Sequence, residues 1–304
     1  MSAPASSPAS PEAKGTRTVT ATPPPRIRPD RSARRVPPAL RTALSPGVLL
    51  AGLIVLAAVA MMLIPGAIAT HDPYTGVAAD RLLAPNGTYL FGTDHLGRDL
   101  FSRVVHGAFL SLASAGTAVL VGVFVGALLG LVSGFVGGTL DFIVMRFIDV
   151  LIAVPSILLA LIVVATLGFG PWSVALGVGL GAAGSFARIM RSQVVRVRNE
   201  EYVEAARTLG VRWPGILLSH ILPNAGRPVI ALAALELGTA ILAVSALSFL
   251  GFGAQPPEPE WGALVSGGRD YVSTAWWLSI LPGIVVLAVV LAVNRLARLI
   301  GGDR

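Results

Sequence analysis

Three long stretches of this sequence contain no Asp, Glu, Lys or Arg, and they limit the possible folds more than any other feature. They lie between Arg41 and Asp72, between Arg103 and Asp141, and between Asp149 and Arg188. An α-helix needs about 20 apolar residues to cross a bilayer. Only 13% of the 304 residues are charged, against about 25% in soluble domains. Because only closed backbone hydrogen bonding survives in hydrocarbon, we expect an all-α polytopic membrane protein.

The apolar stretches divide into six expected transmembrane helices. The stretch after Asp149 is 38 residues long and contains Gly168-Phe169-Gly170-Pro171, so we expect two helices there, joined by a tight turn. Two further apolar segments follow toward the C-terminus. The six expected helices span residues 47–68, 109–134, 143–167, 172–190, 227–250 and 275–297, and residues 109–297 form the core that holds the last five.

The positions of Lys and Arg predict the orientation of these helices. If the N-terminus is cytoplasmic, the cytoplasmic segments hold 19 of the 23 basic residues and the outer segments hold 4. Basic residues concentrate on the cytoplasmic side of membrane proteins, so both termini are expected there. The net charge of +7 is then explained by the basic residues on the cytoplasmic side of the membrane, and we expect no nucleic-acid partner.

The polar segments follow from this orientation. Residues 1–46 are rich in Pro, Ser, Ala and Arg, and we expect a disordered basic tail in the cytoplasm that is solvated or touches anionic lipid. Residues 69–108 are expected to form an outer loop with a short amphipathic helix. Residues 191–226 are expected to be a cytoplasmic loop, and residues 298–304 a second cytoplasmic tail.

Glycines recur at every fourth position in the second expected helix, where they share one face. That spacing lets another backbone approach closely, so we expect helix packing there rather than a ligand. The fourth helix repeats the spacing with Gly177 and Gly181. The glycines of the second helix are Gly122, Gly126, Gly130 and Gly134.

A patterned polar segment, residues 200–224, interrupts the apolar sequence. Residues 200–209 have the pattern of an amphipathic helix, and Gly210 permits a sharp turn because glycine adopts positive φ at low cost. A second helix is expected to begin at Trp213-Pro214 and to end at Pro223-Asn224. The resulting hairpin is either a connector or a docking surface, and a connector needs only a few residues.

The same segment resembles the EAA loop of ABC-importer permeases. The resemblance extends to "FGTDHLGRDLFSRVVHGAFLSL" at residues 91–112 and to "LSFLGFGAQPPEPEWGALVSGGRDY" at residues 247–271, which are similar to DppC/OppC-like subunits of dipeptide, oligopeptide and nickel importers. It covers about residues 45–297. The residues that match the EAA loop are Glu204, Ala205, Ala206, Gly210, Leu222 and Pro223.

This resemblance implies a type I ABC-importer permease in a bacterial cytoplasmic membrane. Such a subunit forms half of a translocation pathway, here for di- or oligopeptides, with nickel or another small solute as the alternative. The implied partners are membrane lipid, a homologous second permease subunit, two cytoplasmic ABC ATPase subunits and an extracellular or periplasmic substrate-binding protein. The matching residues would couple this chain to the ATPases. No cofactor is expected on the chain itself, since the partner ATPases would use ATP and magnesium.

The remaining polar residues suggest fewer roles. Glu236 is the only charged residue inside the fifth expected helix, and it either lines the pathway or bonds to a neighbouring helix. Asp149 is expected to reach water or to pair with Arg146. His71, His95 and His106 lie near aspartates, but none has the ligand spacing of a metal site, so we expect no metal.

The sequence argues against two other classes of function. No phosphate-binding loop and no nucleophile with a nearby base occurs, so we do not expect an enzyme. A secondary transporter or channel that works without an ATPase is the other alternative. It would favour more charged residues within the membrane than Glu236 alone.

Overall fold

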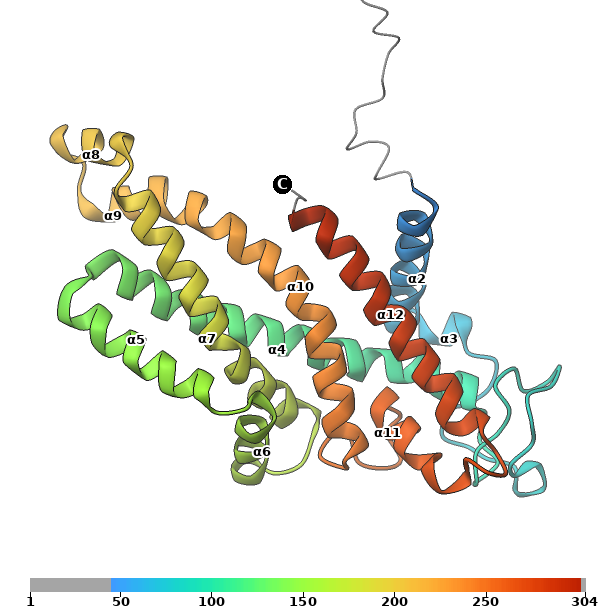
Figure 1. The fold of residues 1–304 in the computed structure, drawn as a ribbon. Helices are drawn as coiled ribbons and strands as arrows, with labels where there is room; N and C mark the ends of the chain where they lie inside the picture. Colours follow the sequence, from blue (N-terminus) through green and yellow to red (C-terminus); the bar gives the residue numbers. More distant parts are fainter. Residues whose placement is uncertain (1–44, 302–304) are drawn as a thin grey trace, which may run out of the picture. The chain divides into compact units, whose positions relative to one another are not determined.

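The computed structural model describes residues 45–301, and this part of the chain is helical without any β-strand (Figure 1). The basic tail expected at residues 1–46 lies almost wholly outside the described residues, as do residues 302–304. The helices are α2 (Pro46–Leu63), α3 (Pro65–Ile68), α4 (Leu100–Val136), α5 (Gly138–Ala153), α6 (Ser156–Leu167), α7 (Pro171–Arg198), α8 (Glu201–Thr208), α9 (Trp213–Ile216), α10 (Leu222–Phe249), α11 (Trp261–Gly267) and α12 (Trp277–Gly301).

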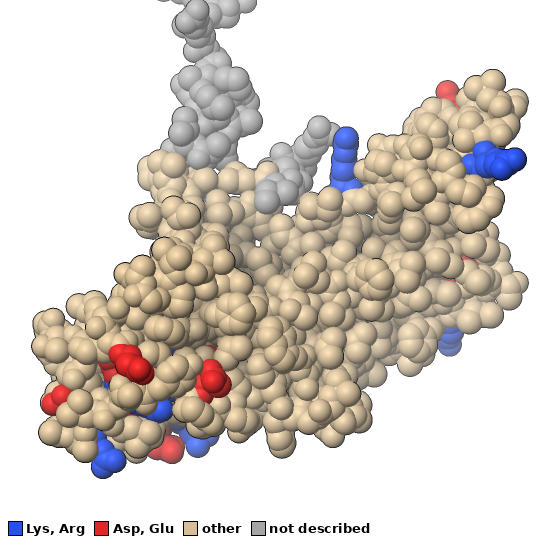
Figure 2. Space-filling model, turned by 180° about the vertical axis from the view of Figure 1, so that it is seen from behind, with Lys and Arg blue, Asp and Glu red and all other residues tan. Residues whose placement is uncertain are grey.

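Five of the described helices are long and apolar enough to cross a membrane, and α5 with α6 supplies a sixth span when the bent pair is counted as one. The expected all-α fold is therefore confirmed, with five spans, or six when the bent pair is counted. In Figure 1, α8, the start of α2 and the end of α12 lie on the upper side, while residues 69–99 and α11 lie on the lower side. We call these two sides the hairpin end and the loop end. Figure 2 shows charged side chains mostly at the two ends, with an uncharged surface between them.

The third expected helix, at residues 143–167, is broken. α5 ends at Ala153, α6 begins at Ser156, and the two helices differ in direction by 93°. Val154 and Pro155 have extended backbones, with ψ values of 127° and 129°. Proline has no N–H to donate and disfavours a helical conformation of the residue before it, so the helix cannot run through this point.

Two helices extend beyond their apolar stretches. α4 begins at Leu100 rather than at residue 109, because the Asp99 side chain accepts a hydrogen bond from the backbone N–H of Ser102 at 2.9 Å and caps the helix. α7 continues to Arg198 rather than ending at residue 190. Hydropathy locates only the part of each helix that suits a bilayer, and both helices project past it.

Glycines bring α4 and α7 into backbone contact. A Cβ built on Gly122 would lie 3.0 Å from the carbonyl oxygen of Gly179, and one on Gly134 would lie 2.9 Å from that of Arg191. Between them, Gly126 and Gly130 lie against the carbonyl groups of Ala183 and Ala187. Any side chain larger than hydrogen at these positions would separate the two helices.

The opposite face of α7 packs on α6 and α5. A Cβ on Gly177 would lie 2.6 Å from the Cα of Ala160, and one on Gly181 would lie 3.0 Å from the Cβ of Ser156. α7 is thus enclosed between α4 and the broken α5–α6 pair, and α10 packs against both α7 and α4.

Ion pairs join α5 to α7. Arg188 donates to Asp149 at 2.7 Å, so the expected pairing with Arg146 is wrong, whereas the alternative of reaching water is consistent with a side chain that is 49% exposed. Arg191 donates two hydrogen bonds to Asp141, which also accepts one from Ser133. We expected a pairing within α5 because the sequence does not reveal that α5 and α7 lie side by side.

Candidate functional site

Residues 199–221 connect α7 to α10, and we call them the hairpin. α8 is amphipathic, with Val203 and Ala206 buried and with Glu201, Glu204 and Arg207 exposed. Val203 belongs to an apolar cluster that includes Val197 of α7 and Ile216 of α9. α8 is therefore held to the helices on either side by a small apolar contact.

Gly210 turns the chain between α8 and α9. Its φ is +82°, a conformation that L-residues rarely adopt, whereas a Cβ at this position would meet no atom within 4 Å. Hydrogen bonds from Leu209 N–H to Ala205 and from Val211 N–H to Ala206 close the end of α8. The backbone conformation, and not a lack of space, requires glycine here.

The second arm of the hairpin does not end at Pro223-Asn224 as expected. α9 passes through a π-helical segment, Leu217–Ile221, directly into α10, so one continuous helix runs from Trp213 to Phe249. Pro223 lies in the first turn of α10, where the wider π-helical turn tolerates the missing N–H. Movement of the hairpin is therefore directly connected to α10.

The hairpin exposes large apolar side chains beside its charges. Leu209 is 84% exposed and Trp213 is 65% exposed, with Tyr202, Val211 and Leu218 also exposed. Of the residues matched to the EAA loop, only Ala206 is buried; Glu204, Ala205, Gly210, Leu222 and Pro223 are exposed. A cluster of exposed apolar groups of this kind marks an interaction surface.

Glu236 lines a cavity of about 320 Å³ between α4, the α5–α6 break, α7 and α10. The carboxylate is half-buried. Within residues 45–301 it makes no side-chain hydrogen bond or ion pair, so the interhelical bond considered for it is not formed inside the described part of the chain.

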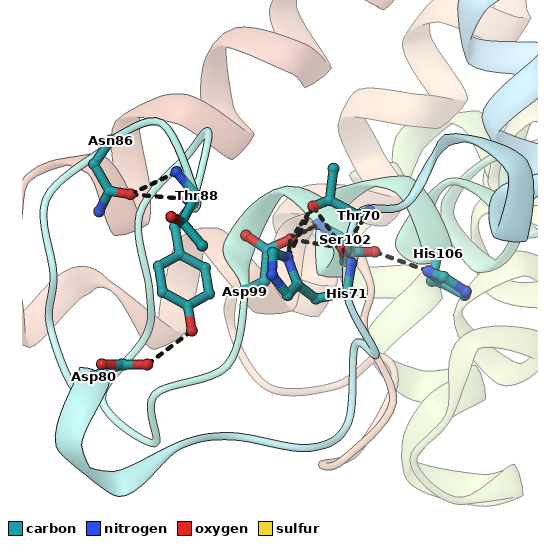
Figure 3. Close-up of polar contacts among 9 residues, drawn as sticks. Thr70, His71, Asp80, Asn86, Thr88, Asp99, Ser102 and His106 are labelled. Carbon is teal, nitrogen blue, oxygen red and sulfur yellow. Dashed lines mark hydrogen bonds and ion pairs between the residues drawn. The ribbon is translucent and has the colours of Figure 1, made fainter.

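Polar side chains at the loop end are bonded to one another (Figure 3). Asp99 accepts hydrogen bonds from Ser102 Oγ at 2.6 Å and from Thr70 Oγ1 at 3.0 Å, and His71 lies 3.6 Å away. His106 Nδ1 lies 2.9 Å from the Ser102 carbonyl oxygen. The aspartate thereby fixes the chain after α3 to the first turn of α4.

The other loop residues considered as metal ligands also have local contacts. The ring of His95 stacks on Tyr271 with 5.7 Å between centroids. Tyr89 donates to Asp80 at 2.8 Å, and this hydrogen bond raises the pKa of the tyrosine. These contacts stabilise the loop, and they do not bring the histidines together.

Glu260 and Trp261 fix α11 to α4, and both side chains are fully buried. The Glu260 carboxylate accepts from the backbone N–H groups of Gly262 and Ala263 and from Ser111 Oγ, at 3.0–3.1 Å. Trp261 Nε1 donates to the Val104 carbonyl at 2.9 Å. Burial raises the pKa of Glu260, and the hydrogen bonds to its carboxylate offset only part of that effect. We did not predict this pair, although an acidic residue directly before Trp-Gly-Ala-Leu is a helix-start signal.

Arg103 joins three parts of the loop end. Its guanidinium donates to the carbonyl groups of Pro73 at 2.8 Å and Pro257 at 3.3 Å, and it lies 3.8 Å from Asp94. The segments before α4 and before α11 are therefore held together by one buried cation.

Comparisons with known proteins identify relatives over most of the chain. The family model described as "Binding-protein-dependent transport system inner membrane component" matches residues 122–302. A probable D,D-dipeptide transport system permease protein of Escherichia coli K12 is 37% identical over 251 residues, which cover 82% of this chain and 84% of that protein. A dipeptide transport system permease protein of Alkalihalophilus pseudofirmus is 37% identical over 81% of each chain. A glutathione transport system permease protein of Shigella flexneri is 44% identical over 70% of each chain.

Two solved structures share the fold. A methionine ABC transporter in an inward-facing conformation has a TM-score of 0.50 at 19% identity, covering 65% of this chain and 96% of that one. An amino acid ABC transporter has a TM-score of 0.51 at 15% identity, covering 66% of this chain and 94% of that one.

Proposed function

This chain belongs to the family of binding-protein-dependent transport system inner membrane components, and we propose that it is the permease subunit of an ATP-driven importer of di- or oligopeptides. The relatives described above carry dipeptides, D,D-dipeptides or glutathione by name, and each of these substrates is a short peptide or a peptide-like molecule. Nickel and other small solutes are the alternative cargo.

The hairpin is the observation that carries this proposal. It joins two membrane-spanning helices: its second arm passes directly into α10, and only Asn199 and Glu200 separate its first arm from α7. It also exposes apolar side chains that need a protein partner. We assign that partner as one of two ABC ATPase subunits, with Glu204 reaching a basic residue on the ATPase and Ala205 allowing close approach.

The remaining partners and the orientation follow from the same assignment. The hairpin faces the cytoplasm, because segments on its side of the membrane hold most of the Lys and Arg residues. The loop end then faces outward, toward a substrate-binding protein. A homologous second permease subunit completes the passage. ATP and magnesium would be bound by the ATPases, and this chain would contribute no catalytic residue.

Reconstitution of the complete transporter in liposomes tests the proposal. We expect accumulation of radiolabelled L-alanyl-L-alanine only when the ATPases have ATP and when the binding protein is present on the opposite side. Uptake that needs no ATP would instead indicate a secondary transporter or channel. Accumulation of radioactive nickel without any uptake of the dipeptide would assign the alternative cargo.

A further inference from the structure

Glu236 lies at a depth where a charge is costly. It is the only charged residue between Arg227 and Glu258, and α10 extends from Leu222 to Phe249 around it. With a rise of 1.5 Å per residue, the carboxylate is about 20 Å from either end of this helix. Acidic side chains at such a depth face a protein interior or a water-filled cavity, and not lipid.

The cavity beside Glu236 has the polar wall that this position requires. Thr239 lies one turn along α10 on the same helical face, and Ser185 of α7 and Ser156 at the start of α6 complete the hydroxyl groups of the lining. Thr239, Ser185 and Ser156 are each exposed to the cavity side of the chain. Small residues fill the rest of the α10 wall, at Ala240 and Ala243.

No positive group balances the carboxylate. The lining of the cavity contains no Lys, Arg or His, and Glu236 makes no ion pair within residues 45–301. A carboxylate surrounded by hydroxyl groups and open to a cavity attracts a cation that can donate several hydrogen bonds. Hydroxyl oxygens of Ser185 and Thr239 can accept the donors that the carboxylate leaves free.

We propose that Glu236 makes this cavity a binding site for an ammonium group, and that the group bound there during transport is the N-terminal ammonium of the peptide. The second half of this statement rests on the proposed function. A single carboxylate holds the charged end of a substrate without selecting its side chains, which suits a passage shared by peptides of different sequence.

Charge-selective labelling tests the site itself. The chain has no cysteine, so a Thr239→Cys variant carries one thiol in this subunit, one helical turn from Glu236. Relative to the rates of the two reagents with a free thiol in solution, we expect a cationic trimethylammonium methanethiosulfonate to modify this thiol faster than an anionic sulfonate reagent, by about tenfold. The preference should disappear when Glu236→Gln is added and should remain with Glu236→Asp. Leu242→Cys, on α10 but not on the cavity lining, is 48% exposed and serves as the control, and its labelling should show no charge preference that depends on Glu236.

Uptake by the reconstituted complex tests the assignment to substrate. Glu236→Gln should lower the uptake of L-alanyl-L-alanine about tenfold while binding-protein-stimulated ATP hydrolysis is retained, and Glu236→Asp should restore part of the uptake. An unreactive Thr239→Cys thiol, equal rates with the two reagents, or undiminished uptake by Glu236→Gln would overturn the proposal. If the Thr239→Cys thiol shows the charge preference but the wild-type complex transports no dipeptide, the ammonium site would be supported and the proposed peptide function would be contradicted.

Discussion

The two ends of the helices use polar residues in opposite ways. At the loop end, Asp99, Arg103 and Glu260 are buried and bonded to other parts of the same chain. At the hairpin end, Glu204 and Arg207 are exposed, and the apolar Leu209 beside them is almost fully accessible. The polar side chains of the loop end bond mainly within this chain, whereas the hairpin end presents exposed apolar side chains.

The difference indicates which end needs a partner to be complete. Buried polar groups that are bonded within one chain favour one conformation, so the loop end gains stability from this chain alone. Covering exposed apolar groups with another surface removes them from water, which lowers the free energy. Substitutions at the loop end should therefore change stability, and substitutions at the hairpin should change coupling while stability is largely kept.

A pair of tryptophans gives the largest expected contrast. Trp261 at the loop end is fully buried, and Trp213 in the hairpin is 65% exposed. Trp261→Ala should lower the free energy of unfolding by about 3–5 kcal/mol, because it leaves a cavity and removes the indole hydrogen bond to the Val104 carbonyl. Trp213→Ala is the matched control and should cost less than about 1 kcal/mol. Thermal unfolding of both variants in detergent measures the difference, and equal losses would contradict the contrast.

Gly210 gives the next largest effect. Gly210→Val should cost about 1–2 kcal/mol, because φ is +82° there and a β-branched residue is strained at positive φ. Peptide uptake should fall at least about tenfold, since strain at the turn would displace α8 from its docking position. Gly210→Asn is the control, because asparagine tolerates positive φ, and it should keep most of the uptake. Uptake by Gly210→Val at the wild-type rate, with normal membrane insertion, would argue against coupling through this turn.

The smallest effect concerns pH at the loop end. Burial raises the pKa of Glu260 above its ordinary value of 4.5, so the folded state holds this proton more tightly than the unfolded state does. The stability contributed by the protonated carboxyl is therefore complete below about pH 4.5 and is lost as the pH rises through the raised pKa. The melting temperature of the wild type relative to Glu260→Gln should decrease across this range. A melting temperature of the wild type that rises with pH relative to Glu260→Gln would contradict a raised pKa of Glu260.

The sequence could predict the spans but not every break between them. Uncharged stretches place helices because burial in lipid demands uncharged side chains and closed hydrogen bonds. Whether a helix ends at a proline was harder to predict. Pro155 breaks a span that was expected to be continuous, while Pro223 lies inside a helix that was expected to end there. Proline removes the same hydrogen bond in both places, and the surrounding turns decide whether the helix continues.

The candidate sites were predictable where they depend on local conformation. Gly210 stands out because its positive φ is a property of a short segment. The ion pair of Asp149 with Arg188 and the contact of Glu260 with Ser111 join residues far apart in the sequence. Such contacts depend on which helices lie side by side, and periodicity along one helix carries no information about that.

The glycine contact between α4 and α7 has a mechanical consequence. Because the backbones of α4 and α7 are in direct contact, no deformable layer of side chains lies between these two helices. α4 is 37 residues long, which corresponds to about 55 Å, and its first turn is anchored at Asp99. α7 continues at its other end toward α8. A displacement of α7 at its hairpin end would therefore be passed directly to α4, whose first turn lies at the loop end.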